Sequence, residues 1–524
     1  MRSTKRTKAR SPRKVLWVPG LAFVSFVCFA AFVGSGVAAT DTDVDKIFSR
    51  WSSPSTPGCA VGAAVNGAPV LAKGYGMADL EHDVRIVPDT IFEAGSVSKQ
   101  FTAAAVLLLA RDGKLSIDDP VRKYIPELPD YGSPLTIRHL LTHTSGLRDW
   151  GNVEAIAGWP RTRRAYTHAH VLEIVSRQKA LNFTPGTRWS YSNTGFNLAA
   201  MIVSRVSGMT FPTFTAQRLF APLGMTHTSW RDDFTRVLKN RAMAYSERNG
   251  EFHTDMPFED VYGNGGLLTT VGDLLRWNEN FTASKIADAA FEAAQQEPGR
   301  FSDGRTHGYA FGLRLTRTNG VGVVEHSGST AGYSAHLLRL PDQHVSVAVL
   351  CNATGARATE YAHQVADLYL AHHEKTAPAA ATPLPASPGE LFRNVDNGLV
   401  LLSAPSGSTW TLDGSRLTVT GRYGVDEIFG RVPKASPTAA DLEALAGTYV
   451  SDEAQTTLTV TFAQGTLAIT RRPDTVFTMT PLYADAFRAP QLGTILFRRD
   501  SSGRVNALSV VDDRVWDLRF ARRT

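Results

Sequence analysis

A run rich in proline and alanine divides this sequence into two parts with different patterns. Residues 376–389 are Thr-Ala-Pro-Ala-Ala-Ala-Thr-Pro-Leu-Pro-Ala-Ser-Pro-Gly. Such a run lacks the apolar periodicity of a helix or a strand and is typical of semi-extended linkers. Because 524 residues exceed what one hydrophobic core usually organises, the linker predicts one domain over 40–375 and another over 390–524.

The part before the linker mixes strand and helix patterns. Val65-Asn66-Gly67-Ala68 predicts a tight hairpin turn between two apolar strands, and a second series of strands follows between residues 309 and 350. Helical patterns cover residues 97–111, 197–206 and 359–373. Strands at both ends with helices between them favour an α/β chain of the α+β kind, in which helices cover one mainly antiparallel sheet.

The part after the linker carries strand patterns almost throughout. Leu458, Val460 and Phe462 alternate with threonines, the chain turns at Gly465, and the alternation then resumes. Residues 410–419 repeat this plan loosely, and 510–515 indicate another hairpin. The pattern predicts an all-β, barrel-like domain over 390–524. No catalytic constellation is expected in it.

The first 39 residues carry seven basic residues and no acidic ones. An apolar run over 15–33 follows the basic residues and ends near Val37-Ala38-Ala39, a pattern typical of a cleaved signal peptide. The chain is therefore expected to be exported to the periplasm or beyond, with an outward-facing membrane anchor as the alternative if the segment is not cleaved. Removing the leader turns the formal charge of +6 into −1, so no nucleic acid or other polyanion is expected as a partner.

The first motif with chemical content is Ser96-Val-Ser-Lys99, ahead of an apolar helical run. A serine at a helix N-terminus lies in the positive end of the helix dipole, beside unpaired backbone N–H groups. Lys99 falls on the same face one turn later. Burial lowers the pKa of a lysine, which can then accept the serine proton. Ser-x-x-Lys also occurs at Ser11 and Ser176, but only Ser96 has glycine before it and an apolar helix behind it.

Two further motifs follow along the chain. Tyr191-Ser-Asn193 offers a phenol that ionises more easily near cations and could pass protons, with an amide to hold a substrate carbonyl or the lysine. A rival Tyr-x-Asn lies at Tyr262-Gly-Asn264. The third motif, His326-Ser327-Gly328-Ser329, closes one strand just before another. Gly328 is expected to let a substrate backbone lie along the strand edge.

These three motifs, in this order, resemble the serine β-lactamase and penicillin-binding protein superfamily, and most closely its class C-like branch. Other stretches are similar to that branch, notably His139-Leu-Leu-Thr-His143-Thr-Ser-Gly and Gly265-Gly266-Leu-Leu-Thr-Thr. The resemblance covers about 45–372. It implies the serine β-lactamase-like fold, in which a helical subdomain accompanies the helix-covered sheet. It also implies Ser96 as the acylated nucleophile, Lys99 as its base and Tyr191 as the proton shuttle. Asn193, His326, Ser327, Gly328 and Ser329 would bind substrate, and the N–H groups of Ser96 and Ser329 would form the oxyanion hole.

The resemblance also bears on histidines and cysteines. His139 and His143 have helical spacing for a metal site, but the related motif is a structural loop and no other ligand cluster accompanies it, so no metal and no cofactor are expected. Cys59 and Cys351 lie in apolar, strand-like runs typical of buried free thiols. In the resembled fold their strands are antiparallel neighbours, so a disulfide between them is the open alternative.

The resemblance implies acyl transfer through a serine ester. Where many β-lactamases carry lysine this chain has His326, and together with a β-rich tail this is similar to DD-carboxypeptidases and D-aminopeptidases. The expected substrates are small peptides or amides that contain D-amino acids, some of them derived from cell walls. An esterase or weak β-lactamase acting on small esters or lactams is an alternative, and so is a penicillin-binding receptor that is acylated without turnover.

Overall fold

The structure, a computed structural model, describes residues 41–161, 164–318, 320–370, 384, 389–403, 405, 408–421 and 423–523. The expected leader lies outside these residues, and so does nearly all of the expected linker. Within the described part of the chain, no helix combines the length and the apolar character needed to cross a membrane.

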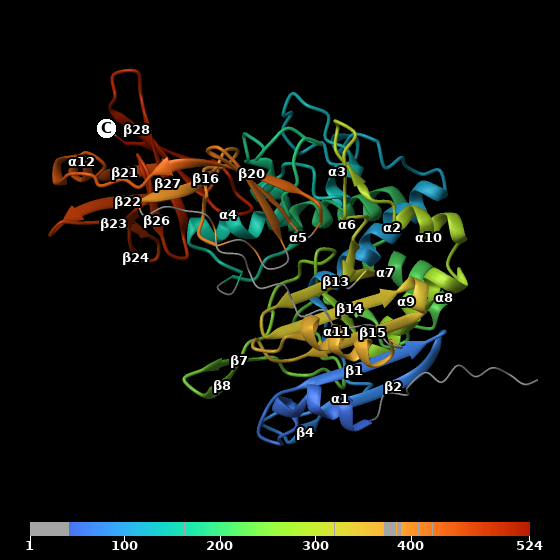
Figure 1. Ribbon diagram of the computed structural model, residues 1–524. Helices are drawn as coiled ribbons and strands as arrows, with labels where there is room; N and C mark the ends of the chain where they lie inside the picture. Colours follow the sequence, from blue (N-terminus) through green and yellow to red (C-terminus); the bar gives the residue numbers. More distant parts are fainter. Residues whose placement is uncertain are drawn as a thin grey trace, which may run out of the picture. The chain divides into compact units, whose positions relative to one another are not determined.

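The first domain is built on a six-stranded antiparallel sheet in the order β12-β13-β14-β15-β1-β2 (Figure 1). Its strands are β1 (Cys59–Val65), β2 (Ala68–Tyr75), β12 (Arg314–Thr318), β13 (Val321–Thr330), β14 (Tyr333–Leu340) and β15 (Val345–Cys351). The hairpin expected at Asn66-Gly67 joins β1 to β2, and both turn residues have positive φ angles of 51° and 76°. Such angles match the twist of tight hairpins, which explains why Asn-Gly is found there.

Alternating side chains of this sheet face two different layers of helices. In β15, Val345, Val347 and Val349 belong to one apolar cluster, whereas Ala348 and Leu350 belong to another. The first cluster includes α1 (Asp41–Ile47) and α11 (Ala358–Leu368), and the second includes α2 (Lys99–Arg111) and α9 (Val271–Ala283). The sheet therefore has a core on each face, as its nearly continuous apolar strands require.

The first and last strands of this sheet are neighbours. β1 pairs with β15 over their whole length, with Cys59 opposite Cys351. A disulfide joins these two buried cysteines across 292 residues of sequence. The antiparallel neighbourhood that the resemblance implied is thus present in the structure.

A second group of helices packs around α6 (Asn193–Ser207) beside the sheet. It comprises α3 (Ile137–Leu141), α4 (Trp150–Ala157), α5 (His168–Ser176) and α7 (Phe211–Thr215). The short α8 (Ala221–Leu223) packs against α9, and α10 (Ala289–Gln295) packs against α2 and α9. Small β-elements connect the layers: β3 (Met77–Asp79), β4 (Val84–Arg85), β5 (Phe92–Glu93), β6 (Ser229–Trp230), β7 (Tyr245–Arg248), β8 (Glu251–Thr254), β9 (Leu267–Thr269), β10 (Gly299–Arg300) and β11 (Thr306–His307). The expected α+β fold, with an antiparallel sheet and a helical subdomain, is confirmed.

Several element boundaries differ from those the sequence indicates. The helix expected from Val97 begins at Lys99, because residues Gly95–Ser98 form a tighter 3-10 turn, η2. The helix expected over 197–206 begins at Asn193 and ends at Gly208, whose φ of 71° terminates it. The strand pattern around residue 309 becomes the short β12, which begins only at Arg314.

The residues after the linker form two antiparallel sheets. The first has the order β17-β16-β20-β19-β18 and comprises β16 (Glu390–Asn394), β17 (Val400–Leu401), β18 (Thr409–Asp413), β19 (Arg416–Thr420) and β20 (Asp426–Pro433). The second has nine strands: β21 (Gly447–Ser451), β22 (Thr456–Ala463), β23 (Thr466–Arg471), β24 (Thr475–Thr478), β25 (Thr480–Pro481), β26 (Ala486–Ala489), β27 (Gly493–Arg499), β28 (Val505–Val511) and β29 (Leu518–Arg522), preceded by α12 (Ala439–Glu443).

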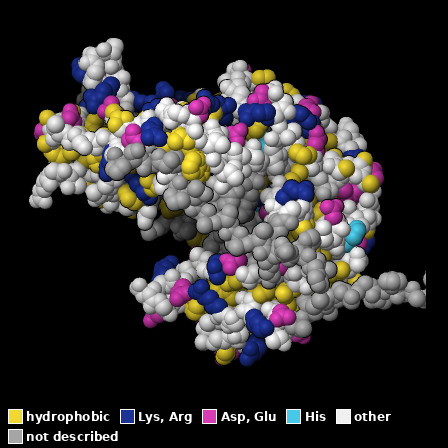
Figure 2. Space-filling model, viewed as in Figure 1, with side chains coloured by type: hydrophobic (Ala, Val, Ile, Leu, Met, Phe, Trp, Pro, Cys, Tyr) yellow, Lys and Arg dark blue, Asp and Glu magenta, His cyan; other side chains and the backbone are white. Residues whose placement is uncertain are grey.

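The nine-stranded sheet curls into a nearly closed barrel. Its order is β24-β23-β22-β21-β29-β28-β27-β26-β25, and only Met479 separates the two edge strands β24 and β25. The all-β, barrel-like second domain is confirmed, with a five-stranded sheet added to it. On the face shown in Figure 2, basic and acidic side chains are interspersed, in keeping with the nearly balanced charge after residue 39.

Candidate active site

Ser96 lies in the 3-10 turn η2, directly before the buried helix α2. The preceding Gly95 has a φ of +50°, and a Cβ on it would lie 2.6 Å from the backbone N of Ser329 in β13. The turn is anchored from the other side, because Leu267 N donates to Ser98 Oγ at 3.1 Å. Glycine before the serine therefore lets η2 press directly against β13.

Lys99 is completely buried one turn after Ser96, and its amine has three oxygen neighbours. Its Nζ lies 3.1 Å from Ser96 Oγ, 2.9 Å from Asn193 Oδ1 and 2.7 Å from the backbone O of Asn264. Burial lowers the pKa of Lys99 well below its ordinary value, and the positive charge of Arg514 adds to the effect.

The protonation state of the Lys99 amine determines which of its three neighbours accept a hydrogen bond from it and which donates one to it. A neutral amine has two N–H groups and one lone pair. The carbonyl oxygens of Asn193 and Asn264 can only accept, so they take the two N–H groups. The lone pair is left facing Ser96, whose hydroxyl donates to it. This arrangement makes Lys99 the base for Ser96.

Tyr191 stands beside the same pair, but its ionisation differs from expectation. It lines the same cavity as Ser96, and its ring centroid lies 4.8 Å from Lys99 Nζ and 4.9 Å from the Arg514 guanidinium. Despite these cations, burial raises the pKa of Tyr191 above its ordinary value. The expectation that nearby cations ionise this phenol is wrong, because the loss of hydration outweighs them.

His143 supports Tyr191 from behind. The two ring centroids are 4.2 Å apart, and the buried imidazole accepts a hydrogen bond at Nδ1 from Ser192 N at 3.2 Å. His139 instead accepts at Nδ1 from Thr136 N and caps α3. Among the described residues, neither histidine belongs to a group of three possible metal ligands. Both side chains thus have structural contacts.

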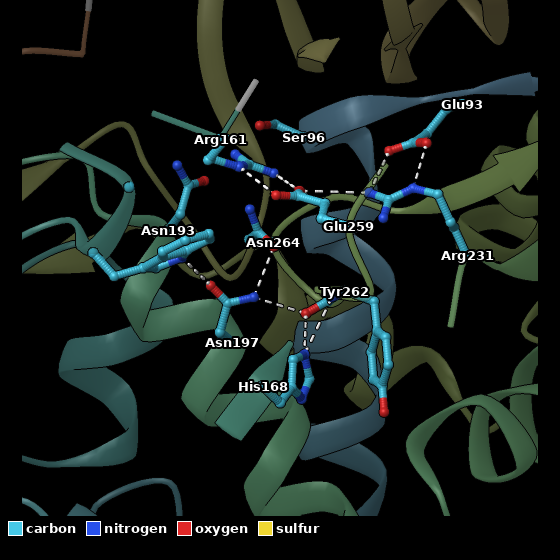
Figure 3. Close-up of polar contacts among 12 residues, drawn as sticks. Glu93, Ser96, Arg161, His168, Asn193, Asn197, Arg231, Glu259, Tyr262 and Asn264 are labelled. Carbon is cyan, nitrogen blue, oxygen red and sulfur yellow. Dashed lines mark hydrogen bonds and ion pairs between the residues drawn. The ribbon is translucent and has the colours of Figure 1, made fainter. Parts of the chain in front are cut away.

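The rival Tyr-x-Asn motif turns out to contribute to the same site. The Asn264 carbonyl accepts from Lys99, while its side-chain Oδ1 accepts from Asn197 Nδ2 at 2.7 Å (Figure 3). Tyr262, in contrast, packs on His168 with ring centroids 4.1 Å apart. The first Tyr-x-Asn supplies the phenol and the second only its asparagine.

Strand β13 forms the opposite wall with residues 327–330. β12 pairs with β13 only as far as Glu325, so the edge beyond that point is open on this side. A Cβ on Gly328 would lie 2.0 Å from the Ala94 carbonyl oxygen and 3.0 Å from Ser96 N. Besides the expected room for substrate, glycine is therefore required at this position because the turn before Ser96 packs onto the strand. This packing brings the N–H groups of Ser96 and Ser329 close together.

His326 does not line the cavity. It is fully buried, its Nε2 lies 3.0 Å from the Tyr309 hydroxyl and its Nδ1 2.6 Å from the Ser327 carbonyl oxygen. The carbonyl can only accept, so Nδ1 carries the proton and Nε2 accepts from Tyr309. Burial lowers the pKa of His326 well below its ordinary value. The substrate-binding role expected for it is corrected to that of a neutral residue behind the wall.

The site opens into a cavity of about 600 Å³. Of the residues expected from the sequence, Ser96, Tyr191, Asn193, Ser327, Gly328 and Ser329 line it, and Lys99 lies beneath Ser96. The sequence did not indicate three arginines that also line it, Arg161, Arg314 and Arg514. None of them stands in a motif, and each comes from a different element.

Arg161 reaches the cavity at the end of a chain of buried charges (Figure 3). Its Nε donates to Glu259 Oε2 at 2.8 Å, and Glu259 also lies 3.6 Å from Arg231 Nη2. Arg231 in turn makes a two-pronged ion pair with Glu93, at 2.9 and 3.1 Å. Alternating charges of this kind satisfy one another in a buried setting, so the charge of Arg161 is largely compensated.

The positive charge of Arg314 is less compensated than that of Arg161. Its Nη1 donates to Ser327 Oγ at 3.1 Å, and its guanidinium lies 5.2 Å from the ring centroid of Tyr423. Its buried Nε has no hydrogen-bond partner, and no carboxylate within ion-pair distance of it is found among the described residues. Arg314 therefore leaves a positive charge at the cavity beside β13.

The barrel, in which no catalytic constellation was expected, contributes two residues to the cavity wall. Asp513 and Arg514 lie in the loop between β28 and β29 and both line the cavity. The loop is held by Asp512, whose Oδ1 accepts from Arg514 N at 2.8 Å and Val515 N at 2.7 Å. Its carbonyls also accept from the catalytic domain, including Asn182 Nδ2 at 2.9 Å.

A serine with a buried lysine base, a protonated tyrosine beside them and two backbone N–H groups at one wall define a serine hydrolase of the acyl-transfer class. Residues 41–370 match the Beta-lactamase family. The chain belongs to this family.

Sequence relatives agree with this assignment. The chain is 28% identical over 304 residues to penicillin-binding protein 4* of Bacillus subtilis, covering 55% of this chain and 67% of that protein. It is 29% identical over 302 residues to a D-aminopeptidase of Gluconobacter oxydans, covering 57% of this chain and 56% of that enzyme. The chain thus spans only about half to two thirds of these relatives' lengths.

A solved structure shows the same fold. The octameric penicillin-binding protein homologue from Pyrococcus abyssi superposes with a TM-score of 0.55 at 23% identity, covering 81% of this chain and 96% of that one. At this identity the likeness concerns the fold.

Proposed function

We propose that this chain is an exported serine hydrolase that cleaves small peptides or amides containing D-amino acids through an acyl-enzyme on Ser96. The D-aminopeptidase and penicillin-binding relatives support the substrate class. The single observation that carries the reaction type is the completely buried Lys99 amine 3.1 Å from Ser96 Oγ.

The first step follows from the hydrogen-bond arrangement. Lys99 takes the proton of the Ser96 hydroxyl, and Ser96 Oγ attacks the substrate carbonyl carbon, so a C–O bond forms and the carbonyl π electrons move to oxygen. The N–H groups of Ser96 and Ser329 donate to this oxyanion. Asn193 and Asn264 hold the new ammonium of Lys99 through the oxygens that already bind its amine.

The second step needs an acid for the leaving nitrogen. Tyr191 keeps its proton because burial raises its pKa, and it lines the cavity together with Ser96. It gives that proton to the departing amine as the C–N bond breaks, and the ammonium of Lys99 restores the proton. Water then attacks the serine ester, with its proton leaving by the same route in reverse, and releases the acid.

Arg314 favours a substrate that carries a carboxylate. Its uncompensated charge lies at the open edge of β13, where the guanidinium also donates to Ser327 Oγ. A negatively charged hydrogen-bond acceptor on the substrate would replace the water that the guanidinium loses on burial. A peptide with a free C-terminal carboxylate, as in a carboxypeptidase reaction, fits this position. We therefore rank peptides ending in a D-amino acid first.

One observation favours a second candidate, an aminopeptidase or amidase. Asp513 brings a largely exposed carboxylate to the cavity, and a carboxylate there suits the free ammonium of a D-amino acid amide. The nearest cation to it is its neighbour Arg514, at 3.6 Å from Nε to Oδ2. The two candidates thus place opposite ends of a D-amino acid in the same cavity.

Export remains part of the proposal. The expected leader supports it, and so does the buried disulfide between Cys59 and Cys351, because disulfides persist in oxidising compartments. Fractionating cells that produce the chain, followed by N-terminal sequencing, tests both export and the cut before Thr40. Recovery of the protein only in the cytosol would overturn it.

A substrate panel tests the reaction. The purified protein and Ser96→Ala are compared on peptides ending in D-Ala-D-Ala, D-amino acid anilides, short aryl esters and a chromogenic cephalosporin. Turnover of the first or second class, lost in Ser96→Ala, is expected. Preferential ester or cephalosporin hydrolysis would favour the esterase or β-lactamase alternative. A stable penicillin adduct without any turnover would identify an acylated receptor, and activity that survives in Ser96→Ala would reject the assignment.

Substitutions of two arginines in β12, one as the test and one as its control, distinguish the two candidate activities. Arg314→Gln should lower kcat/KM at least about tenfold for carboxylate-bearing peptides, the loss expected for a charge-assisted hydrogen bond, and leave anilides unchanged. Arg317→Gln is the control, since the Arg317 side chain is exposed and its guanidinium donates to the Gly320 carbonyl. A loss confined to D-amino acid amides in Asp513→Asn would instead favour the aminopeptidase.

A further inference from the structure

Three side chains outside the catalytic machinery converge on one point between the sheet and helix α11. Glu325 Oε2 lies 3.1 Å from His336 Nε2 and 2.8 Å from His363 Nε2. The three atoms all lie within 4.8 Å of one another. Glu325 and His336 are buried, and the His363 side chain is 25% exposed.

The register of the strands explains why they meet. Glu325 in β13 and His336 in β14 lie on the sheet face whose other residues pack against α11, the face opposite to His326 and Ser96. His363 lies on α11, four residues after Thr359 and so one turn further along the same helix face. Three elements separated in sequence thus each contribute one donor atom.

Two further polar atoms of this group, one on His336 and one on Glu325, have other partners. His336 Nδ1 lies 3.0 Å from Thr359 Oγ1, and Thr316 Oγ1 donates to Glu325 Oε1 at 3.2 Å. Partners of this kind fix the ring and the carboxylate in metal sites, leaving Nε2 and the other oxygen for the ion.

We propose that Glu325, His336 and His363 form a binding site for Zn²⁺. Two imidazoles and one carboxylate are a ligand set that zinc prefers, whereas calcium and magnesium prefer oxygen alone. Tetrahedral zinc with bonds of about 2.0–2.1 Å keeps neighbouring donors roughly 3.3 Å apart. The two carboxylate–imidazole distances of 3.1 and 2.8 Å therefore need to grow by only a few tenths of an ångström. The partly exposed side at His363 leaves room for water as the fourth ligand.

Such a site would join α11 to β13 and β14. Thr359, which holds His336, also lines the catalytic cavity, so the ion would lie one hydrogen bond behind the cavity wall. Its role there is to hold the wall in place; the acyl-transfer steps need no metal at this position.

The chain offers a matched control. Asp79, Glu81 and His82 also lie within ligand distance of one another, but on the surface, where His82 Nδ1 pairs with Asp79 Oδ2 at 2.8 Å. Exposed acidic groups of this kind bind cations weakly. Comparing variants of the buried cluster and of this surface cluster therefore distinguishes binding at a specific site from weak binding at the surface.

The test uses the whole purified protein after removal of metals with a chelator. Equilibrium dialysis against Zn²⁺ with elemental analysis should give one tightly bound ion per chain, with a raised Tm, and Co²⁺ should give the visible spectrum of a tetrahedral site. His363→Gln keeps a hydrogen-bond donor for Glu325 but removes a ligand, and should weaken Zn²⁺ binding at least about tenfold. His82→Gln should bind Zn²⁺ as the unaltered protein does.

Three results would overturn the proposal: no ion retained by the unaltered protein, equal binding by His363→Gln, or loss of binding in His82→Gln. His363 is partly exposed and its replacement keeps the hydrogen bond, so the variant is expected to fold. Its Tm without metal, compared with that of the unaltered protein, checks this directly. The readouts do not depend on catalysis, and so they stand whether or not the proposed hydrolase activity is found.

Discussion

Replacing Gly95 by alanine tests how closely the nucleophile's turn must approach strand β13. Two costs arise at this position. The φ of +50° is unfavourable for alanine by about 1–2 kcal/mol. In addition, the new Cβ would lie 2.6 Å from Ser329 N, so the turn and the strand must separate by about 0.8 Å to reach an ordinary contact.

The second cost falls on catalysis. Separating η2 from β13 moves the N–H groups of Ser96 and Ser329 apart, and these are the two proposed donors to the oxyanion. A misplacement of about 1 Å in an active site costs on the order of 100-fold in rate, and loss of one oxyanion donor costs about 100- to 1,000-fold. We expect kcat to fall about 100-fold with little change in KM.

Gly113→Ala is the matched control. Gly113 has a similar φ of +68°, but nothing lies within 4 Å of the Cβ position. Gly113→Ala should lose about 1–2 kcal/mol of stability in urea unfolding, and Gly95→Ala should lose more because of the added close contact. Only Gly95→Ala should lose activity, measured on the best substrate of the panel and by acylation with a fluorescent penicillin. If the two variants retain equal activity, the close approach does not position the oxyanion hole.

Three further predictions concern the base, the disulfide and the tail. Only neutral Lys99 can accept the serine proton, and burial lowers its pKa. We therefore expect kcat/KM to rise with pH and to level off well below pH 10.5. A pH–rate profile that is still rising at the ordinary lysine pKa would contradict this. Replacing Cys59 and Cys351 together by alanine should cost about 2–5 kcal/mol in urea unfolding but leave kcat unchanged at 25 °C, and thiol titration of the native protein should find neither cysteine free. Arg148 Nη1 lies 2.7 Å from Glu453 Oε2 in a buried pair, so Arg148→Met should destabilise by about 3–5 kcal/mol, whereas a change below 1 kcal/mol would show that the barrel contributes little there.

The sequence predicts those parts of the site that local motifs encode. Ser96 and Lys99 are one helical turn apart, and Tyr191 and Asn193 flank the start of α6, so short spacings suffice to find them. The strand pattern and the Asn-Gly turn likewise indicate the antiparallel sheet. The neighbouring positions of Cys59 and Cys351 follow from no local motif. They can be expected only from a resemblance that supplies the strand order of the whole sheet.

Features that depend on burial or long-range packing could not be predicted. Arg314 and Arg514 carry no motif, and they reach the cavity only because β12 and the barrel loop pack there. The protonation of Tyr191 depends on hydration lost in the folded state, which no residue pattern records. The convergence of His336 and His363 on one carboxylate depends on the position of α11 over β14.

The position of β1 between β15 and β2 has a consequence for synthesis. The hairpin of β1 with β2 can form as soon as both strands are made, but the other edge of β1 has no partner until β15 is complete, about 280 residues later, as the register of Cys59 with Cys351 shows. During that interval an apolar strand edge is open to pairing with another copy of the chain. Refolding yield should therefore fall with protein concentration, and cells that make this protein need to shield the newly made hairpin until the last strand arrives.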